Sequence, residues 1–104
     1  MPQTAGIYLM IDFDWPQPFE QAHAKLARAL HEALQGKTWI KESVAASGGI
    51  GGELDSTWFF WLENYAALDN LLRDENDEIA QAYKTFFSAM PAVIEKIREA
   101  VVFL

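Results

Sequence analysis

Two histidines and the carboxylates of one strand are the side chains of this sequence whose types and positions suit acid–base chemistry. In the stretch FEQAHAKLARALHEAL, at about 100° per residue, His23 falls in the apolar sector of a helix, near Phe19 and Leu26. An imidazole that faces an interior can act as a base or a hydrogen-bond donor near neutral pH. The position also suits a partly buried histidine that is only hydrogen-bonded, so both interpretations stay open. His31 falls on the flank of this helix, where we expect it to be solvated.

Asp12 is the second candidate catalytic residue. It belongs to the run IYLMIDFD, on the strand face that also carries Tyr8 and Met10. A carboxylate on a covered face needs a cationic partner, or its pKa shifts. Lys41 or Arg98 could supply that partner, and a purely structural ion pair is the alternative to a catalytic role.

Aromatic side chains are candidate contacts for a small apolar ligand, namely Tyr8, Trp58, Trp61 and Phe86. In the run STWFFWLE, Trp58 and Trp61 are three residues apart, so a strand would point them to opposite faces. At most one of these indoles can therefore face a given cavity. Packing in a core or an interface is the alternative for both, and core packing is the alternative for Phe86.

Sequence motifs for metals, cofactors and nucleophiles do not accompany these residues. The chain has no cysteine, no H-E-x-x-H, no P-loop and no G-x-S-x-G. His23 and His31 are eight residues apart, too far to form a simple metal pair on one helix. The stretch GGIGG lacks a following lysine and leads into a strand, which predicts a flexible hairpin connection. We therefore expect no metal and no cofactor.

Length and charge narrow the class of protein. A chain of 104 residues predicts one domain over residues 1–104. The formal net charge of −7 would repel nucleic acid and anionic membrane surfaces, so neither is an expected partner. Uninterrupted apolar runs are far shorter than the roughly 20 residues that span a bilayer. The first residues lack the pattern of a secretory signal, and with no cysteines a cytoplasmic location is expected.

Hydrophobic periodicity predicts an alternating order of strands and helices. Strands are expected over 5–15, 37–47 and 56–63, and helices over 19–34, 64–74 and 75–90. Pro91 should kink the last helix or start another that continues to Arg98, and a short strand should end the chain over 100–104. This is the β-α-β-β-α-β order of an α+β, ferredoxin-like fold, in which helices cover one face of a four-stranded antiparallel sheet.

The strand STWFFWLE is apolar on both faces, although the helices can cover only one. Fully burying a large apolar side chain contributes roughly 1.5–3 kcal/mol, so leaving two or three exposed would forfeit a large share of a small domain's stability. A patch of this kind usually has a partner, and a second copy around a two-fold axis is the commonest one. The sequence therefore predicts a homodimer that forms through the open face of the sheet.

The element order, the two-sided aromatic strand and the step WLENYAALDNLL from that strand into a helix resemble the dimeric α/β-barrel superfamily. Its members include the antibiotic-biosynthesis monooxygenase, EthD and NIPSNAP types. The resemblance implies a dimer of facing sheets and a cavity between each sheet and its helices. Haem-degrading relatives hold iron through a histidine on the helix after the third strand, and this chain has no histidine beyond His31.

The resemblance leaves three functions open. The first is a monooxygenase-like enzyme that acts on a small aromatic or apolar metabolite, with His23 and then Asp12 as its acid–base groups. The second is a non-catalytic module that binds such a ligand in the same cavity. The third is a dimerisation module without a ligand.

Overall fold

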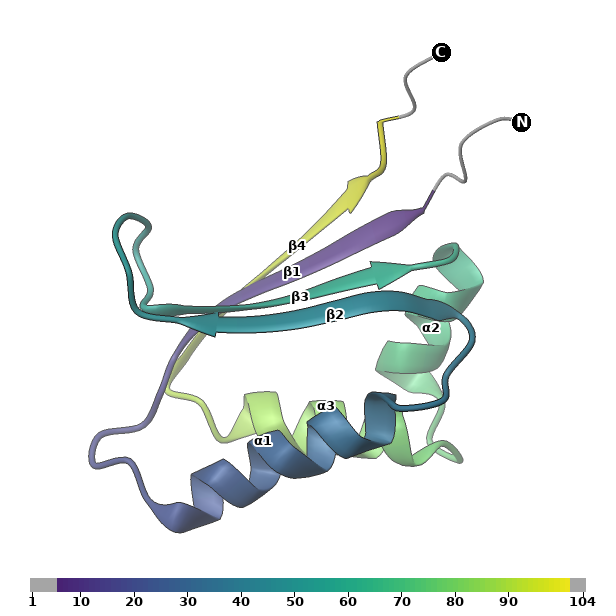
Figure 1. Ribbon diagram of the computed structural model, residues 1–104. Helices are drawn as coiled ribbons and strands as arrows, with labels where there is room; N and C mark the ends of the chain where they lie inside the picture. The colour runs from purple at the N-terminus through teal and green to yellow at the C-terminus, as the bar shows by residue number, and fades with distance from the viewer. Residues whose placement is uncertain (1–5, 102–104) are drawn as a thin grey trace.

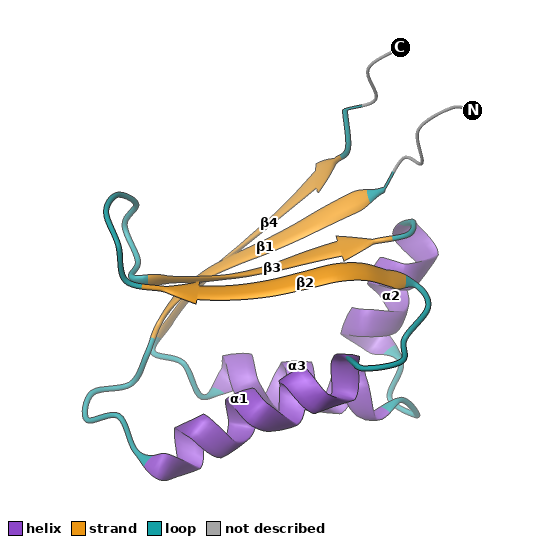
Figure 2. Cartoon of the chain, in the orientation of Figure 1, coloured by secondary structure: helices purple, strands orange, loops and turns teal. Residues whose placement is uncertain are grey.

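A four-stranded antiparallel sheet with all helices on one side forms the fold (Figures 1 and 2). The computed structural model describes residues 6–101. In chain order the elements are β1 (Ile7–Asp14), α1 (Gln21–Leu34), β2 (Ile40–Ser47), β3 (Ser56–Leu62), α2 (Tyr65–Arg73), α3 (Glu78–Ser88) and β4 (Ala92–Glu99). The strand order is β2-β3-β1-β4, and every neighbouring pair is antiparallel. The predicted α+β, ferredoxin-like class is confirmed.

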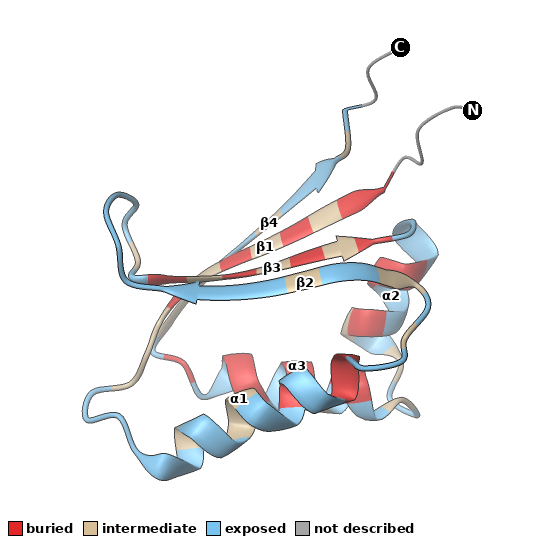
Figure 3. Ribbon diagram, viewed as in Figure 1, coloured by how far each residue is buried: buried red, intermediate tan, exposed pale blue. Residues whose placement is uncertain are grey.

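The two central strands, β1 and β3, bury every second side chain (Figure 3). Because successive strand side chains point to opposite faces, alternate residues of β1 and β3 reach the helices. The buried strand residues are Ile7, Leu9, Ile11, Phe13, Ser56, Trp58, Phe60 and Leu62. The helices complete the core with Leu30, Leu68, Leu71, Ile79, Phe86 and neighbouring apolar residues. The hydrophobic core therefore lies between the sheet and the helices.

The last strand differs from its prediction. Residues 92–99 form β4 rather than a kinked helix, and no strand occupies residues 100–101; residues 102–104 lie outside the described part. Val93 and Ile97 are four apart, a spacing that fits one face of a helix and also one face of a strand. Pro91 cannot donate a helical hydrogen bond and ends α3. Antiparallel pairing with the whole length of β1 then makes the segment a strand.

A bulge in β2 changes which of its residues face the helices. Ile40, Val44 and Ala46 are expected on one face by simple alternation, but this is wrong because the register shifts between Ile40 and Glu42. An extra residue in one strand moves the following side chains to the other face. Beyond the bulge, Ser43 and Ala45 pair with buried residues of β3 and face the helices.

Polar caps define the starts of the two helices that follow β3. Asn64 accepts the Ala67 backbone N–H at 2.9 Å at the start of α2. Asp77 accepts the Ile79 backbone N–H at 3.0 Å at the start of α3, and its carboxylate also lies 3.0 Å from Lys37 Nζ. The Ile79 hydrogen bond and, next, Lys37 lower the pKa of Asp77 below its ordinary value.

We expect Asp77→Asn to destabilise the protein by about 0.5–1 kcal/mol at pH 7, because asparagine still caps the helix but lacks the charge. A lowered folded-state pKa means that this stabilisation is fully present above about pH 4 and is lost as the pH falls further. Urea unfolding at pH 7, 5 and 3 measures it. Asp69→Asn, in the exposed pair with Arg73, is the control and should cost less. An equal Asp77→Asn effect at all three pH values would contradict this assignment.

Candidate functional site: a groove between α1 and β2

A groove of about 440 Å³ separates α1 from the β2 edge of the sheet. Its lining residues are Trp15, Ala24, Ala27, Arg28, His31, Glu32, Ala45 and Trp58. The groove exists because only the C-terminal half of α1 is fully buried, through Leu30, Ala33 and Leu34. Opposite the N-terminal half, β2 presents only small side chains, so the helix and the strand leave a space between them.

Two indoles form the aromatic walls of this groove, and hydroxyl groups of β2 hold both. Trp58 Nε1–H donates to Ser43 Oγ at 2.9 Å, and Trp15 Nε1–H donates to Ser47 Oγ at 2.9 Å. Each indole also packs edge-on against Phe86, with ring centroids 5.2 Å and 5.5 Å away. The orientation of both rings is therefore set by a hydrogen bond and by an aromatic contact.

A chain of hydroxyl groups continues from Trp15 along the end of the hairpin. Ser56 Oγ–H donates to Asp55 Oδ1 at 2.8 Å, and Ser47 lies 2.8 Å from Ser56. Because the Ser56 proton is directed at Asp55, Ser47 donates to Ser56 while accepting from Trp15. Asp14 Oδ1 accepts the Asp55 backbone N–H at 3.0 Å. These bonds tie the hairpin base to β1 and fix one end of the groove.

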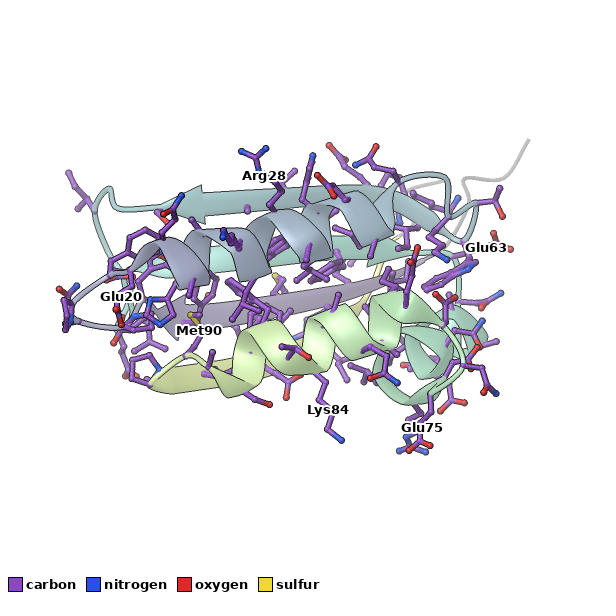
Figure 4. All side chains as sticks on the ribbon, turned by 90° about the horizontal axis from the view of Figure 1, so that it is seen from below. Glu20, Arg28, Glu63, Glu75, Lys84 and Met90 are labelled. Atoms are coloured by element: carbon purple, nitrogen blue, oxygen red, sulfur yellow. The ribbon has the colours of Figure 1, made fainter. Side chains whose placement is uncertain are left out.

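The α1 side of the groove is polar. Arg28, His31 and Glu32 line it together, and Arg28 extends from α1 on the side of β2, away from α3 (Figure 4). Around Trp15 the groove adjoins a second hollow of about 320 Å³, lined by Trp15, Gln17, Phe19 and Asp55. The two hollows share the indole of Trp15, whose ring packs edge-on against Phe19 with centroids 5.3 Å apart.

The predicted ligand contacts divide between the two faces of the sheet. Trp58 lines the groove, and Phe86 is fully buried directly behind it. Tyr8 and Trp61 pair with each other across β1 and β3, and both lie on the open face. Trp58 and Trp61 do point to opposite faces, as the strand period predicts.

His23 takes part in the start of α1. Its Nδ1 accepts the Glu20 backbone N–H at 3.0 Å, which forms one half of a reciprocal capping box. With Nδ1 engaged, the neutral ring carries its proton on Nε2, so taking up a further proton at Nδ1 would break the cap. The ring lies 5.8 Å from that of Phe19, next to the second hollow rather than inside the groove.

Asp12 lies on the open face in a polar network of its own. Its carboxylate accepts the Thr57 hydroxyl at 2.8 Å and lies 3.4 Å from Lys96 Nζ. The cationic partner is therefore Lys96 from β4, instead of the expected Lys41 or Arg98. The sheet separates Asp12 from the groove.

Sequence reasoning missed Trp15, Arg28 and His31. His31 is exposed, as expected, and it also lines the groove. A signal was present, because Ala24 and Ala27 lie at helical spacing before His31 and mark a strip of small residues along one side of the helix. The divergence of α1 from β2, which exposes that strip, has no local signal.

The opposite edge of the covered face is closed by a tyrosine. Tyr83 of α3 donates its hydroxyl proton to Glu95 of β4. Burial, and then the hydrogen bond to Glu95, raise the pKa of Tyr83 far above its ordinary value, so the hydroxyl stays protonated. This pair satisfies the polar groups beside β4.

The open face carries a second distinctive surface, which we name the open-face patch: Tyr8, Met10, Val44, Phe59, Trp61 and Ile94. The Tyr8 ring lies 5.3 Å from that of Phe59 and 6.0 Å from that of Trp61. Val44 and Ile94, at its margins, are 48% and 42% exposed. Within residues 6–101, no element covers these side chains on the side away from the helices.

Comparison with solved structures supports the class of fold. A dimeric ferredoxin-like protein from Thermobifida fusca has a TM-score of 0.70 at 16% identity, and the alignment covers 94% of this chain and 93% of that one. A Dabb family protein with a ferredoxin-like fold from Mesorhizobium loti has a TM-score of 0.67 at 11% identity, with coverages of 90% and 95%. Dimeric ferredoxin-like proteins are thus structural neighbours, as the resemblance implied.

An enzyme is also among these neighbours. Hydroxynitrile lyase from Passiflora edulis has a TM-score of 0.74 at 12% identity, with coverages of 95% and 96%. No protein-family model and no curated protein matches the sequence. Between residues 6 and 101, no helix is both long and apolar enough to cross a bilayer.

We expect Ser43→Ala to cost about 1–3 kcal/mol of unfolding free energy, because it leaves the buried Trp58 N–H without its acceptor. Ser47→Ala is the matched control on the same strand. Ser47 accepts from Trp15, which is less buried than Trp58, so water can take the place of the Ser47 hydroxyl. The loss of unfolding free energy should therefore be smaller for Ser47→Ala than for Ser43→Ala. Urea unfolding followed by tryptophan fluorescence measures both. A Ser47→Ala effect equal to or larger than that of Ser43→Ala would contradict the anchoring of Trp58.

Proposed function

We propose that this protein is a homodimer that pairs through the open-face patch and binds a small, flat, apolar molecule in the groove of each protomer. The observation that carries the ligand site is the pair of indoles held by Ser43 and Ser47 beside an open groove. Aromatic walls in fixed orientations favour a planar ligand because they need no reordering when it binds.

The proposed dimer rests on the chemistry of the open-face patch. Monomeric proteins seldom leave a contiguous aromatic and aliphatic surface of this kind facing water. Four of the six patch residues lie on the central strands β1 and β3, so the patch occupies the middle of the face. Solved neighbours described as dimeric add support. We assign Tyr8 and Trp61 to this interface.

The proposed ligand site rests on size and lining. The volume of about 440 Å³ lies in the usual range of about 300–1,000 Å³ for small-molecule sites. Trp15 and Trp58 line it with aromatic atoms, Ala27 and Ala45 leave room, and His31 and Arg28 offer polar contacts at the rim. An aromatic ring with one polar substituent is the chemistry that this lining fits.

Acid–base catalysis on that ligand, including monooxygenase-like chemistry, is a second candidate function. The observation that favours it is the position of His31, an imidazole on the groove wall whose ring makes no hydrogen bond to the described residues. His23 could contribute only by giving up its cap, and Asp12 only to chemistry on the open face. His31 is therefore our first candidate for the acid–base group.

A pair of adjacent alanines separates the two parts of the proposal, because Ala45 faces the groove and Ala46 faces away from it. We expect Ala45→Trp to abolish quenching of tryptophan fluorescence by 1-naphthol and to leave the dimer intact. Ala46→Asp should raise the dimer dissociation constant at least about tenfold, by placing a charge in an apolar interface, and should preserve 1-naphthol binding. Sedimentation velocity measures assembly. Identical behaviour of both variants would refute the separation of dimer face and groove.

The role of His31 can be read from the imidazole C–H signals in proton NMR, because the chain contains two histidines. We expect 1-naphthol to shift the His31 signals, since the ring would border the bound molecule. The His23 signals, assigned with His23→Gln, should move less. Absence of any His31 shift at saturating 1-naphthol would remove this residue from the site.

A further inference from the structure

The loop that joins β2 to β3, residues 48–55, carries at its tip an apolar side chain with no packing partner among residues 6–101. Ile50, at the tip, is 105% exposed, the largest value among the exposed large hydrophobic residues of the described part. Glycines flank it on both sides, and Gly48, Gly49, Gly51 and Gly52 all have positive φ values. That region is open to glycine and strained for an isoleucine, so the glycines shape the loop that presents Ile50.

The direction of this loop is set at its base. The Gly48 backbone N–H donates to Asp55 O at 2.8 Å, which closes the loop. Asp14 and Ser56 hold Asp55 from β1 and β3. From this base the loop rises away from the helices, toward the open side of the sheet (Figure 1). It therefore leads away from the groove, and Ile50 is not placed to cover a ligand bound there.

We infer that the β2–β3 loop is an arm that packs Ile50 against a second copy of this chain. This inference rests on the proposed open-face dimer. Two sheets that pack face to face lie about 10 Å apart. Each limb of an eight-residue loop spans at most about 13–14 Å, so the tip reaches across that separation. The arm would enlarge the interface beyond the open-face patch and bury an apolar side chain that is otherwise in water.

Substitution of Ile50 at the tip of the loop tests the arm, because the arm should affect the dimer dissociation constant. In sedimentation velocity, Ile50→Ser should raise the dimer dissociation constant by about tenfold to a hundredfold, because two-fold symmetry places the residue in each dimer twice. Ile50→Leu is the conservative control and should stay within about threefold of the unmodified protein, since it keeps the apolar volume. Far-UV circular dichroism should be the same for all three proteins.

A cross-linking experiment tests contact directly, because the chain has no cysteine of its own. Ile50→Cys carrying benzophenone-maleimide should give a covalent dimer on irradiation. Thr85→Cys, at an exposed position of α3 on the helix side, is the matched control and should give none above background.

The outcomes distinguish the arm from the dimer itself. The arm is supported if Ile50→Ser weakens dimerisation while Ile50→Leu does not, and if the probe at position 50 gives a covalent dimer while the probe at position 85 does not. A dimeric protein whose dissociation constant Ile50→Ser leaves unchanged, without cross-linking at Ile50, overturns the arm and leaves the open-face dimer standing. An unmodified protein that stays monomeric at high micromolar concentration overturns both.

Discussion

A sheet with two apolar faces and helices for only one of them is the constraint on which this structure depends. The side chains of β1 and β3 that reach the helices are all buried, and those that point away include Tyr8, Phe59 and Trp61. Burying large apolar side chains is worth several kcal/mol, comparable with the net stability of a domain of this size. The covered face therefore gives the chain its fold, and the open face leaves an apolar surface that the helices do not cover.

The groove forms because the helices do not cover their side of the sheet evenly. Large residues of α3, with Phe86 at the centre, fill the space over β1 and β3, and Tyr83 closes the side toward β4. Over β2, the N-terminal half of α1 faces Ser43, Ala45 and Ser47, and none of these is large enough to fill the gap. Ser43 and Ser47 instead accept hydrogen bonds from the indoles of Trp58 and Trp15. Their small side chains therefore leave the groove open and also fix the orientation of the two indoles that line it.

The local pattern of apolar and polar residues is sufficient to predict some elements of this fold and not others. The strands at β1 and β3 and the α1 helix follow from hydrophobic periodicity. The β4 strand is not predicted because Val93 and Ile97 satisfy both periods, and its pairing with β1 joins residues 78 to 92 positions apart. The β2 faces were misassigned because one extra residue at a bulge reverses the alternation.

The sequence by itself determined the class of fold, the alternating sets of side chains on β1 and β3, and the presence of aromatic residues on both sides of one strand. These depend on the spacing of residues that are neighbours along the chain. Only the tertiary structure decided that Lys96 pairs with Asp12, that His23 caps a helix, and that His31 rather than His23 borders a groove. Such outcomes depend on the distance between an edge strand and the helix packed over it, and side chains from distant segments set that distance together.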